Sequence, residues 1–353
     1  MTMKISKSIN ITPLNPLKNF HFCLKTIRNS SLNLNVQAPK CPMELTNEIA
    51  VEQTSTSTTG NSKDVYSSSV PDASKESTFR RAFKFYKQRS SSVDLSGVVD
   101  LRVSNSAIGL KCVPIRTTIK LDDIPGLRPT DEWSLSTFDS RPGLFVLNNI
   151  FTSSGQLDWL QRSLMEFAEP PNVTNLTVDG SYSGSNVFLE KGEKLRWITM
   201  GNDYDWTAKT YADRPRSSMP IELVKLGAAV SEILELGRFD VDAAILNCYP
   251  EKATLSAHVD RSERSISRPL ISLSFGQSAI YLTGGVNLDD PVDACLLQSG
   301  DVLVMHGDQR LVYHAVPRIL RTTKFTDDRR VVHEKVLDYA NRCRVNITLR
   351  QVD

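Results

Sequence analysis

Residues Arg268–Gly285 read RPLISLSFGQSAIYLTGG. Two short apolar runs flank a Gly-Gln pair, and in the first run serine alternates with Ile, Leu and Phe. Alternation with a period of two is typical of β-strands, because successive side chains of a strand point to opposite faces. The stretch therefore predicts two short strands joined by a turn.

Similar short runs surround this stretch, with Gly, Pro and Asp between them: AAILNCY (243–249), DVLVMHG (301–307) and RVNITLRQV (344–352). Earlier in the chain the period is helical. Residues 153–167 place Leu157, Leu160, Leu164 and Phe167 on one face, and residues 220–237 begin with Pro and end with Gly. Helices followed by a run of strands predict an α+β fold, with a mostly antiparallel sheet system and helices on one side.

The composition of the 353 residues is that of an ordinary globular chain, with 40% hydrophobic and 23% charged residues. No apolar run approaches the length that spans a bilayer. The formal net charge of +2 identifies no polyanionic partner by itself. Six cysteines without a CxxC pair favour a reducing compartment over a disulfide framework.

The first acidic residue is Glu44, and the preceding segment is basic and rich in Ser, Thr and Asn. This composition predicts a mitochondrial transit peptide or a disordered basic leader over residues 1–43. A low-complexity linker is expected over 44–74, an N-terminal extension over 75–141 and the main domain over 142–353. We expect a monomer in mitochondria, the nucleus or both, with a further cytoplasmic pool.

The extension contains FRRAFKFYKQR, Phe79–Arg89. Its aromatic residues fall at helical spacing, and basic residues fill the other faces. The pattern predicts a helix that docks by its aromatic face and offers Arg80, Arg81 and Lys84 to phosphate groups.

A candidate metal site begins with His258 and Asp260 in LSAHVDRSER. In a strand these two side chains would share a face. The residues alone leave His306, His314 and His333 open as a third ligand. Two histidines and one carboxylate are typical of non-haem Fe(II) oxygenases, and a zinc hydrolase could use the same set.

The last predicted strand, RVNITLR, favours the oxygenase. One face carries Arg344, Asn346, Thr348 and Arg350, and the other is apolar. If the polar face lines a cavity beside the metal, its guanidinium groups can bind the far carboxylate of a dicarboxylate such as 2-oxoglutarate. A zinc hydrolase needs no such anchor.

Taken together, HVD, YHAVPR and RVNITLRQ resemble the ordered motifs of the AlkB family of Fe(II)/2-oxoglutarate dioxygenases, over about residues 79–353. The resemblance selects His314 as the third ligand of Fe(II). It implies that 2-oxoglutarate contacts Asn247, Tyr249, Arg344, Asn346 and Arg350, with Arg344 as the main anchor. It also implies that Trp197 and Tyr204 bind the substrate.

The resemblance further implies a double-stranded β-helix, or jelly roll, with buttressing helices. The implied reaction uses O₂ to demethylate or hydroxylate methylated bases of nucleic acid, with tRNA favoured over DNA. Two alternatives are a zinc-dependent hydrolase on a cupin-like barrel and a catalytically inactive nucleic-acid-binding module. The chain departs from the family at Ser262, where some members carry an acid, and in the long insert between His314 and Arg344.

Overall fold

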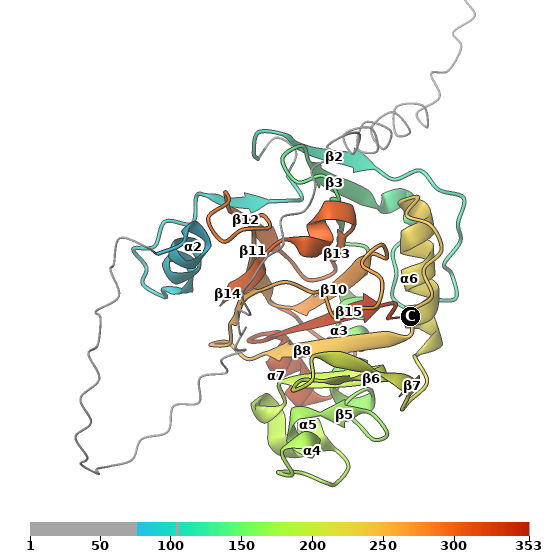
Figure 1. Cartoon of the computed structure of the whole chain (residues 1–353). Helices are drawn as coiled ribbons and strands as arrows, with labels where there is room; N and C mark the ends of the chain where they lie inside the picture. Colours follow the sequence, from blue (N-terminus) through green and yellow to red (C-terminus); the bar gives the residue numbers. More distant parts are fainter. Residues whose placement is uncertain (1–75, 104–105, 353) are drawn as a thin grey trace, which may run out of the picture. The chain divides into compact units, whose positions relative to one another are not determined.

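Two β-sheets dominate the computed structural model, which describes residues 76–103 and 106–352 (Figure 1). The larger sheet has the order β2-β3-β4-β13-β10-β15-β8-β6-β5, with β7 paired to β6, and the smaller has the order β1-β12-β11-β14-β9. The strands of the larger sheet are β2 (Leu110–Pro114), β3 (Ser134–Phe138), β4 (Leu144–Asn148), β5 (Val173–Thr174), β6 (Trp197–Asp205), β7 (Thr210–Pro215), β8 (Ala243–Tyr249), β10 (Leu270–Gly276), β13 (Val302–Met305) and β15 (Arg344–Arg350). Those of the smaller sheet are β1 (Val98–Asp100), β9 (Leu255–His258), β11 (Ser278–Thr283), β12 (Asp293–Leu297) and β14 (His314–Leu320). All strand pairs are antiparallel except β1 with β12.

The two sheets enclose an apolar core to which both contribute. Leu270 and Leu303 come from the larger sheet, Ala279 and Val316 from the smaller, and all are buried in one cluster. This is the two-sheet architecture of a jelly roll, so the predicted fold class is confirmed. The predicted alternation is seen in β15, where Val345, Ile347 and Leu349 are fully buried.

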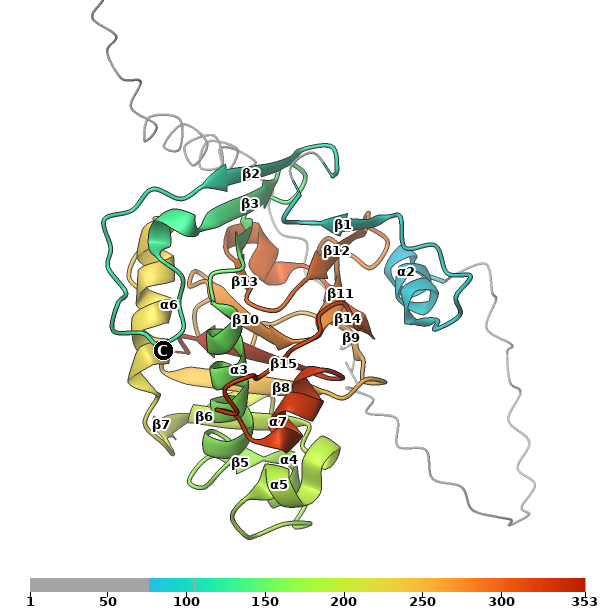
Figure 2. The same cartoon turned by 180° about the vertical axis from the view of Figure 1, so that it is seen from behind.

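The helices and helical turns are α2 (Thr78–Lys87), η2 (Thr130–Glu132), α3 (Ser153–Gln161), η3 (Arg162–Glu166), α4 (Asn175–Val178), α5 (Val187–Lys191), η4 (Gly192–Lys194), α6 (Ile221–Ile233), η5 (Gly307–Leu311) and α7 (Glu334–Ala340). Figure 2 shows α3, α6 and α7 along one face of the larger sheet. Trp159 of α3 stacks on Phe275 of β10, with ring centroids 6.3 Å apart. Gly227 lets α6 pack closely on Val241, because a Cβ there would lie 2.5 Å from the valine side chain.

The start of α6 follows the sequence signal, but its end does not. Pro220 directly precedes Ile221, whereas the helix ends at Ile233 and the first residue with positive φ after it is Glu235 rather than Gly237. At α3 the cap is Thr152 rather than a serine, since its Oγ1 accepts a hydrogen bond from the Gly155 amide at 3.0 Å. None of the helices among the described residues is long and apolar enough to cross a membrane.

The extension predicted over residues 75–141 is not separate from the domain that follows. β1 pairs with β12, and β2 and β3 continue the larger sheet from β4. Strands on both sides of residue 141 therefore share one sheet. The predicted leader (1–43) and linker (44–74) lie outside the described residues.

The insert between β14 and β15 is mostly irregular, and its only helix among the described residues is α7, capped by His333. Buried Gln277 holds the insert in place. Its amide nitrogen donates to the carbonyls of Thr323 and Ala340, and its Oε1 accepts from the backbone N–H of Thr322 and Thr323. This clamp fixes the start of the insert and the end of α7 against the sheet.

Candidate active site

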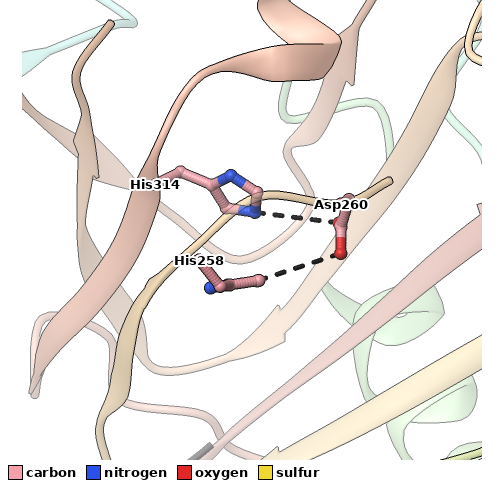
Figure 3. A group of neighbouring side chains, drawn as sticks. All are labelled: His258, Asp260 and His314. Atoms are coloured by element: carbon pink, nitrogen blue, oxygen red, sulfur yellow. Dashed lines mark ion pairs between the residues drawn. The ribbon is translucent and has the colours of Figure 1, made fainter. Parts of the chain in front are cut away.

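His258, Asp260 and His314 form a cluster at the smaller sheet (Figure 3). His258 and His314 are register partners on β9 and β14. Asp260 Oδ1 lies 3.9 Å from His258 Nε2, and Oδ2 lies 3.7 Å from His314 Nε2. One ligand atom from each residue lies within 4.8 Å of the others, so a single ion can contact all three.

The other ring nitrogen of each histidine faces a backbone carbonyl. His258 Nδ1 lies 2.9 Å from the Ser256 oxygen, and His314 Nδ1 lies 3.3 Å from the Val312 oxygen. A proton on Nδ1 satisfies these contacts and leaves the Nε2 lone pair facing the cluster. This arrangement orients imidazole ligands of metals in proteins.

The charges of the cluster also suit a metal ion. Burial lowers the pKa of His314 to about 3, and His258 adds to this effect, so the ring stays neutral. Burial alone would raise the pKa of Asp260, but the guanidinium of Arg350 holds it well below its usual range. A neutral imidazole and an ionised carboxylate are the forms that bind metal. Two imidazole nitrogens and one carboxylate oxygen are ligands that suit Fe(II), so these three residues could hold that ion.

The sequence argument for this pair was partly wrong. It placed His258 and Asp260 on one face of a strand, but β9 ends at His258. Asp260 lies beyond the strand and is oriented by Arg350 of β15, whose Nη2 donates to Asp260 Oδ2 at 3.1 Å. Of the other candidate histidines, His333 caps α7 and His306 precedes η5, and neither belongs to the cluster.

Glu263 is a buried residue that the sequence analysis did not assign to the site. Its carboxylate pairs with Arg350 and also with Arg310, at 2.7 Å, and the side chains of Glu263 and Arg310 are almost fully buried. Arg310 also donates to the Arg268 carbonyl at 2.7 Å, which ties η5 to the segment after Asp260. Two guanidinium groups and two carboxylates therefore balance in a buried network that holds Asp260.

Replacing Glu263 by Gln should lower the free energy of unfolding by about 3 kcal/mol, because it leaves an uncompensated buried cation. Urea unfolding measures the change. Glu222→Gln is the matched control, since Glu222 pairs with Arg162 at the edge of the protein and should cost at most about 1 kcal/mol. Equal losses in the two variants would contradict a structural role for the buried network.

Arg344 lies within the fold, 2% exposed, with its guanidinium among polar groups of neighbouring strands. Nη2 donates to Ser274 Oγ at 2.8 Å, Nη1 reaches the carbonyls of Gln277 and Leu297 at 3.5 Å, and buried Nε has no partner. Among the described residues no carboxylate lies within ion-pair distance of it. Burial lowers its pKa to about 10, so the group remains a cation that an anionic ligand would compensate.

The remaining cosubstrate candidates lie on the strands beside Arg344. Tyr249 is its register partner on β8, and Asn247 faces Asn346 two residues along. Asn346 is already bonded, with its amide nitrogen near Ser272 Oγ and the Leu273 carbonyl. The structure brings these four residues to the same pair of strands, while Arg350 is engaged by Asp260 and Glu263.

The proposed substrate residues lie on the β6–β7 hairpin in an aromatic cluster. Trp197 and Tyr204 each approach Trp206, with ring centroids 5.0 and 4.9 Å apart, and Tyr204 also approaches Tyr211. The Tyr204 hydroxyl lies 3.0 Å from Ser262 Oγ, two residues after Asp260, which brings the cluster to the metal site. Trp206 and Tyr211 were missed; the only local signal was that Trp206 follows Tyr204 at the i+2 spacing of a strand.

The basic helix α2 docks on the smaller sheet as predicted from its aromatic face. Phe79 is fully buried against Ile280 and Leu282. Arg80, Arg81 and Lys84 are exposed. Arg80 and Lys84 share the carboxylate of Glu76, and Arg81 donates to Thr78 Oγ1 at 3.0 Å. The helix therefore keeps an exposed positive surface that is only partly neutralised.

Comparisons with known proteins agree with this site. The family described as the 2OG-Fe(II) oxygenase superfamily matches residues 143–350. The human nucleic acid dioxygenase ALKBH1 is 34% identical over 69% of this chain and 70% of its own length. The Schizosaccharomyces pombe tRNA demethylase abh1 is 33% identical over 61% and 81%. The Arabidopsis thaliana DNA N(6)-methyladenine demethylase ALKBH1A is 28% identical over 81% and 99%.

Proposed function

We propose that this chain, which belongs to the 2OG-Fe(II) oxygenase superfamily and within it to the AlkB family, oxidises methyl groups on the bases of nucleic acid. The family uses Fe(II), 2-oxoglutarate and O₂. When bound, these supply the oxidising power that converts a methyl C–H bond to C–OH, while 2-oxoglutarate loses CO₂ and becomes succinate. An N-hydroxymethyl product then releases formaldehyde, whereas a C-hydroxymethyl product remains.

The residues of the chain position the reactants. In this proposal His258, Asp260 and His314 hold the metal, and Arg350 with Glu263 keeps Asp260 in place. Arg344 binds the far carboxylate of 2-oxoglutarate. The buried ring of Tyr281, 5.9 Å from that of His314, and the apolar core beside it keep water away from the reacting atoms.

The aromatic cluster of the β6–β7 hairpin is the observation that carries the substrate class. A base must leave its stack to reach an enclosed site, and aromatic rings stabilise an extruded base by stacking. Tyr204 offers such a ring beside Ser262, and Trp197 belongs to the same aromatic cluster. Relatives named as a tRNA demethylase and a DNA demethylase support both substrates. The basic helix α2 leads us to favour tRNA.

Mass spectrometry of modified nucleosides tests the substrate. Purified tRNA and DNA are incubated separately with the protein, Fe(II), 2-oxoglutarate and O₂, and the digested nucleosides are compared with a reaction lacking 2-oxoglutarate. Loss of a methylated nucleoside from tRNA, with a smaller change in DNA, is the expected result. A larger loss of methylated nucleosides from DNA would contradict the preference for tRNA, but it would still support the proposed demethylation of nucleic acid.

The buried cation of Arg344 favours an oxygenase over the zinc hydrolase, since hydrolysis needs no dicarboxylate anchor. Succinate release that depends on Fe(II) and 2-oxoglutarate separates the oxygenase from both alternatives. A protein that binds tRNA but forms no succinate would be the catalytically inactive binding module.

Charge reversal on α2 tests whether this helix contacts tRNA. Replacing Arg80, Arg81 and Lys84 by Glu should weaken tRNA binding and reduce the slope of log affinity against log salt by roughly 2, because about three phosphate contacts are lost. The control variant reverses Lys120, Lys225 and Arg238. Equal tRNA affinities in the two variants would show that α2 does not bind tRNA.

Mitochondrial import remains our proposal for localisation, and it rests on the basic, acid-free composition before Glu44. Residues 1–42 fused to a fluorescent reporter should direct part of the signal to mitochondria. A reporter that stays diffuse or purely nuclear would speak against a transit peptide.

A further inference from the structure

A polar cavity of about 300 Å³ lies beside the N-terminus of α3. Its walls come from segments far apart in the chain: Asn149 after β4, Ser299 between β12 and β13, and residues 323–326 of the insert. Figure 2 shows the insert passing beside α3 on its way to α7. Because Gln277 holds Thr323 by its backbone, the insert forms a fixed wall of the cavity.

The lining is positively charged. It includes Arg102, Arg128 and Lys324, and no acidic side chain of the described residues lines it. Arg102 is braced by buried Asp301, since its Nε and Nη2 donate to Asp301 Oδ1 at 3.0 and 2.7 Å. Arg128 donates through Nε to the Phe151 carbonyl at 3.2 Å and lies 3.4 Å from Glu132. Lys324 is exposed and makes no ion pair with any of the described residues.

Donor capacity remains after these contacts are counted. Each guanidinium has five N–H donors in a rigid fork. Arg102 Nη1 donates to none of the described residues, and Arg128 Nη2 is likewise without a partner there. The guanidinium groups of Arg102 and Arg128 are therefore held in place, while one terminal nitrogen of each remains available to donate hydrogen bonds to a ligand.

Ser299 supplies an independent observation. The residue is only 4% exposed, it lines the cavity, and its Oγ has no hydrogen-bond partner within the part of the chain that the structure describes. A buried hydroxyl without a partner costs free energy, which a bound acceptor would recover. Ser153 lines the same cavity in the first turn of α3, where backbone N–H groups and the helix dipole favour an anion.

We propose that this cavity is a phosphate-binding site, separate from the cluster of His258, Asp260 and His314. Arginine forks, an ammonium group, hydroxyls and a helix N-terminus together match a tetrahedral, multiply charged anion with several acceptor oxygens. The phosphate is either a free phosphate group or a phosphodiester of a nucleic-acid backbone. The site also gives the insert between His314 and Arg344 a role, since the insert contributes Lys324 and one wall.

The test titrates the full chain with sodium phosphate at constant ionic strength by isothermal calorimetry. The double variant Arg128→Gln, Lys324→Gln should weaken phosphate binding by at least about tenfold, because charge-assisted hydrogen bonds are lost. Lys324→Gln alone, at an exposed position, should fold normally and weaken binding in the same direction. Ser299→Ala should also weaken it, since it removes the buried donor.

Two controls locate the effect. Lys225→Gln with Arg238→Gln removes the same charge elsewhere and should leave phosphate binding unchanged. Arg344→Lys alters the buried cation near the metal site and should also leave it unchanged. Phosphate binding that is equal in the double variant and the first control, or that is lost only with Arg344→Lys, would overturn the proposal.

A second arm separates the two sources of phosphate. Short oligothymidylate is titrated into wild type and the double variant. Weaker oligothymidylate binding in the variant assigns the site to a nucleic-acid backbone, and unchanged oligothymidylate binding with weaker phosphate binding assigns it to a free phosphate group. If neither ligand distinguishes the variant from wild type, the cavity is not a phosphate site.

Discussion

Replacing His314 by Ala is expected to abolish tight Fe(II) binding and, with it, succinate formation at every 2-oxoglutarate concentration. The change leaves only His258 and Asp260 of the three ligand atoms that lie within 4.8 Å of one another. His306 and His333, the other histidines among the described residues, lie outside the cluster and cannot replace the lost nitrogen. Bound iron, measured after anaerobic loading and desalting, gives a result that does not depend on turnover.

His333→Ala is the matched control for that experiment. His333 caps α7 outside the cluster, so its loss should cost about 1 kcal/mol of stability and leave bound iron unchanged. If the His314 variant retains iron, or the His333 variant loses it, the ligand assignment is wrong.

Arg344→Lys is expected to weaken 2-oxoglutarate binding by about ten- to a hundredfold while bound iron stays the same. Lysine keeps the charge but loses the planar fork, and a charge-assisted hydrogen bond contributes about 1.5–3 kcal/mol. The site is enclosed, since Arg344 is 2% exposed, so water cannot replace the missing donor easily. Equilibrium binding of 2-oxoglutarate to the metal-loaded protein gives the affinity, and the concentration dependence of succinate formation checks it.

Arg342→Lys is the control, because Arg342 lies at the surface and pairs with Asp338 and Glu193. Wild-type 2-oxoglutarate affinity in the Arg344 variant would move the anchor to Arg350. That outcome would require Arg350 to release Asp260 or Glu263, so it would also change how the metal cluster is held.

The sequence by itself determined the elements and most of the chemistry. Period-two alternation located strands such as β10 and β15, since a strand with an apolar face must repeat every second residue. Proline before α6 marked the start of that helix, because this signal is local. The motif order around His258, His314 and Arg344 identified the family, which the comparisons confirmed.

Other features depended on pairing between distant segments, and local patterns carry no information about which edge a strand joins. The strands before residue 141 show this: β2 and β3 extend the larger sheet, which only the pairing with β4 reveals. The faces of β15 could have met solvent in an edge strand. The structure places β15 between β10 and β8, where both faces are buried.

The tertiary structure alone decided how the site is held together. Asp260 lies beyond the end of β9, so its position comes from Arg350, ninety residues later in the chain, and not from the pleat of a strand. Glu263 had no assigned role from the sequence, yet it is buried between Arg310 and Arg350. Burial and charge pairing arise only when separate segments exclude water together, and this is why no local pattern could disclose them.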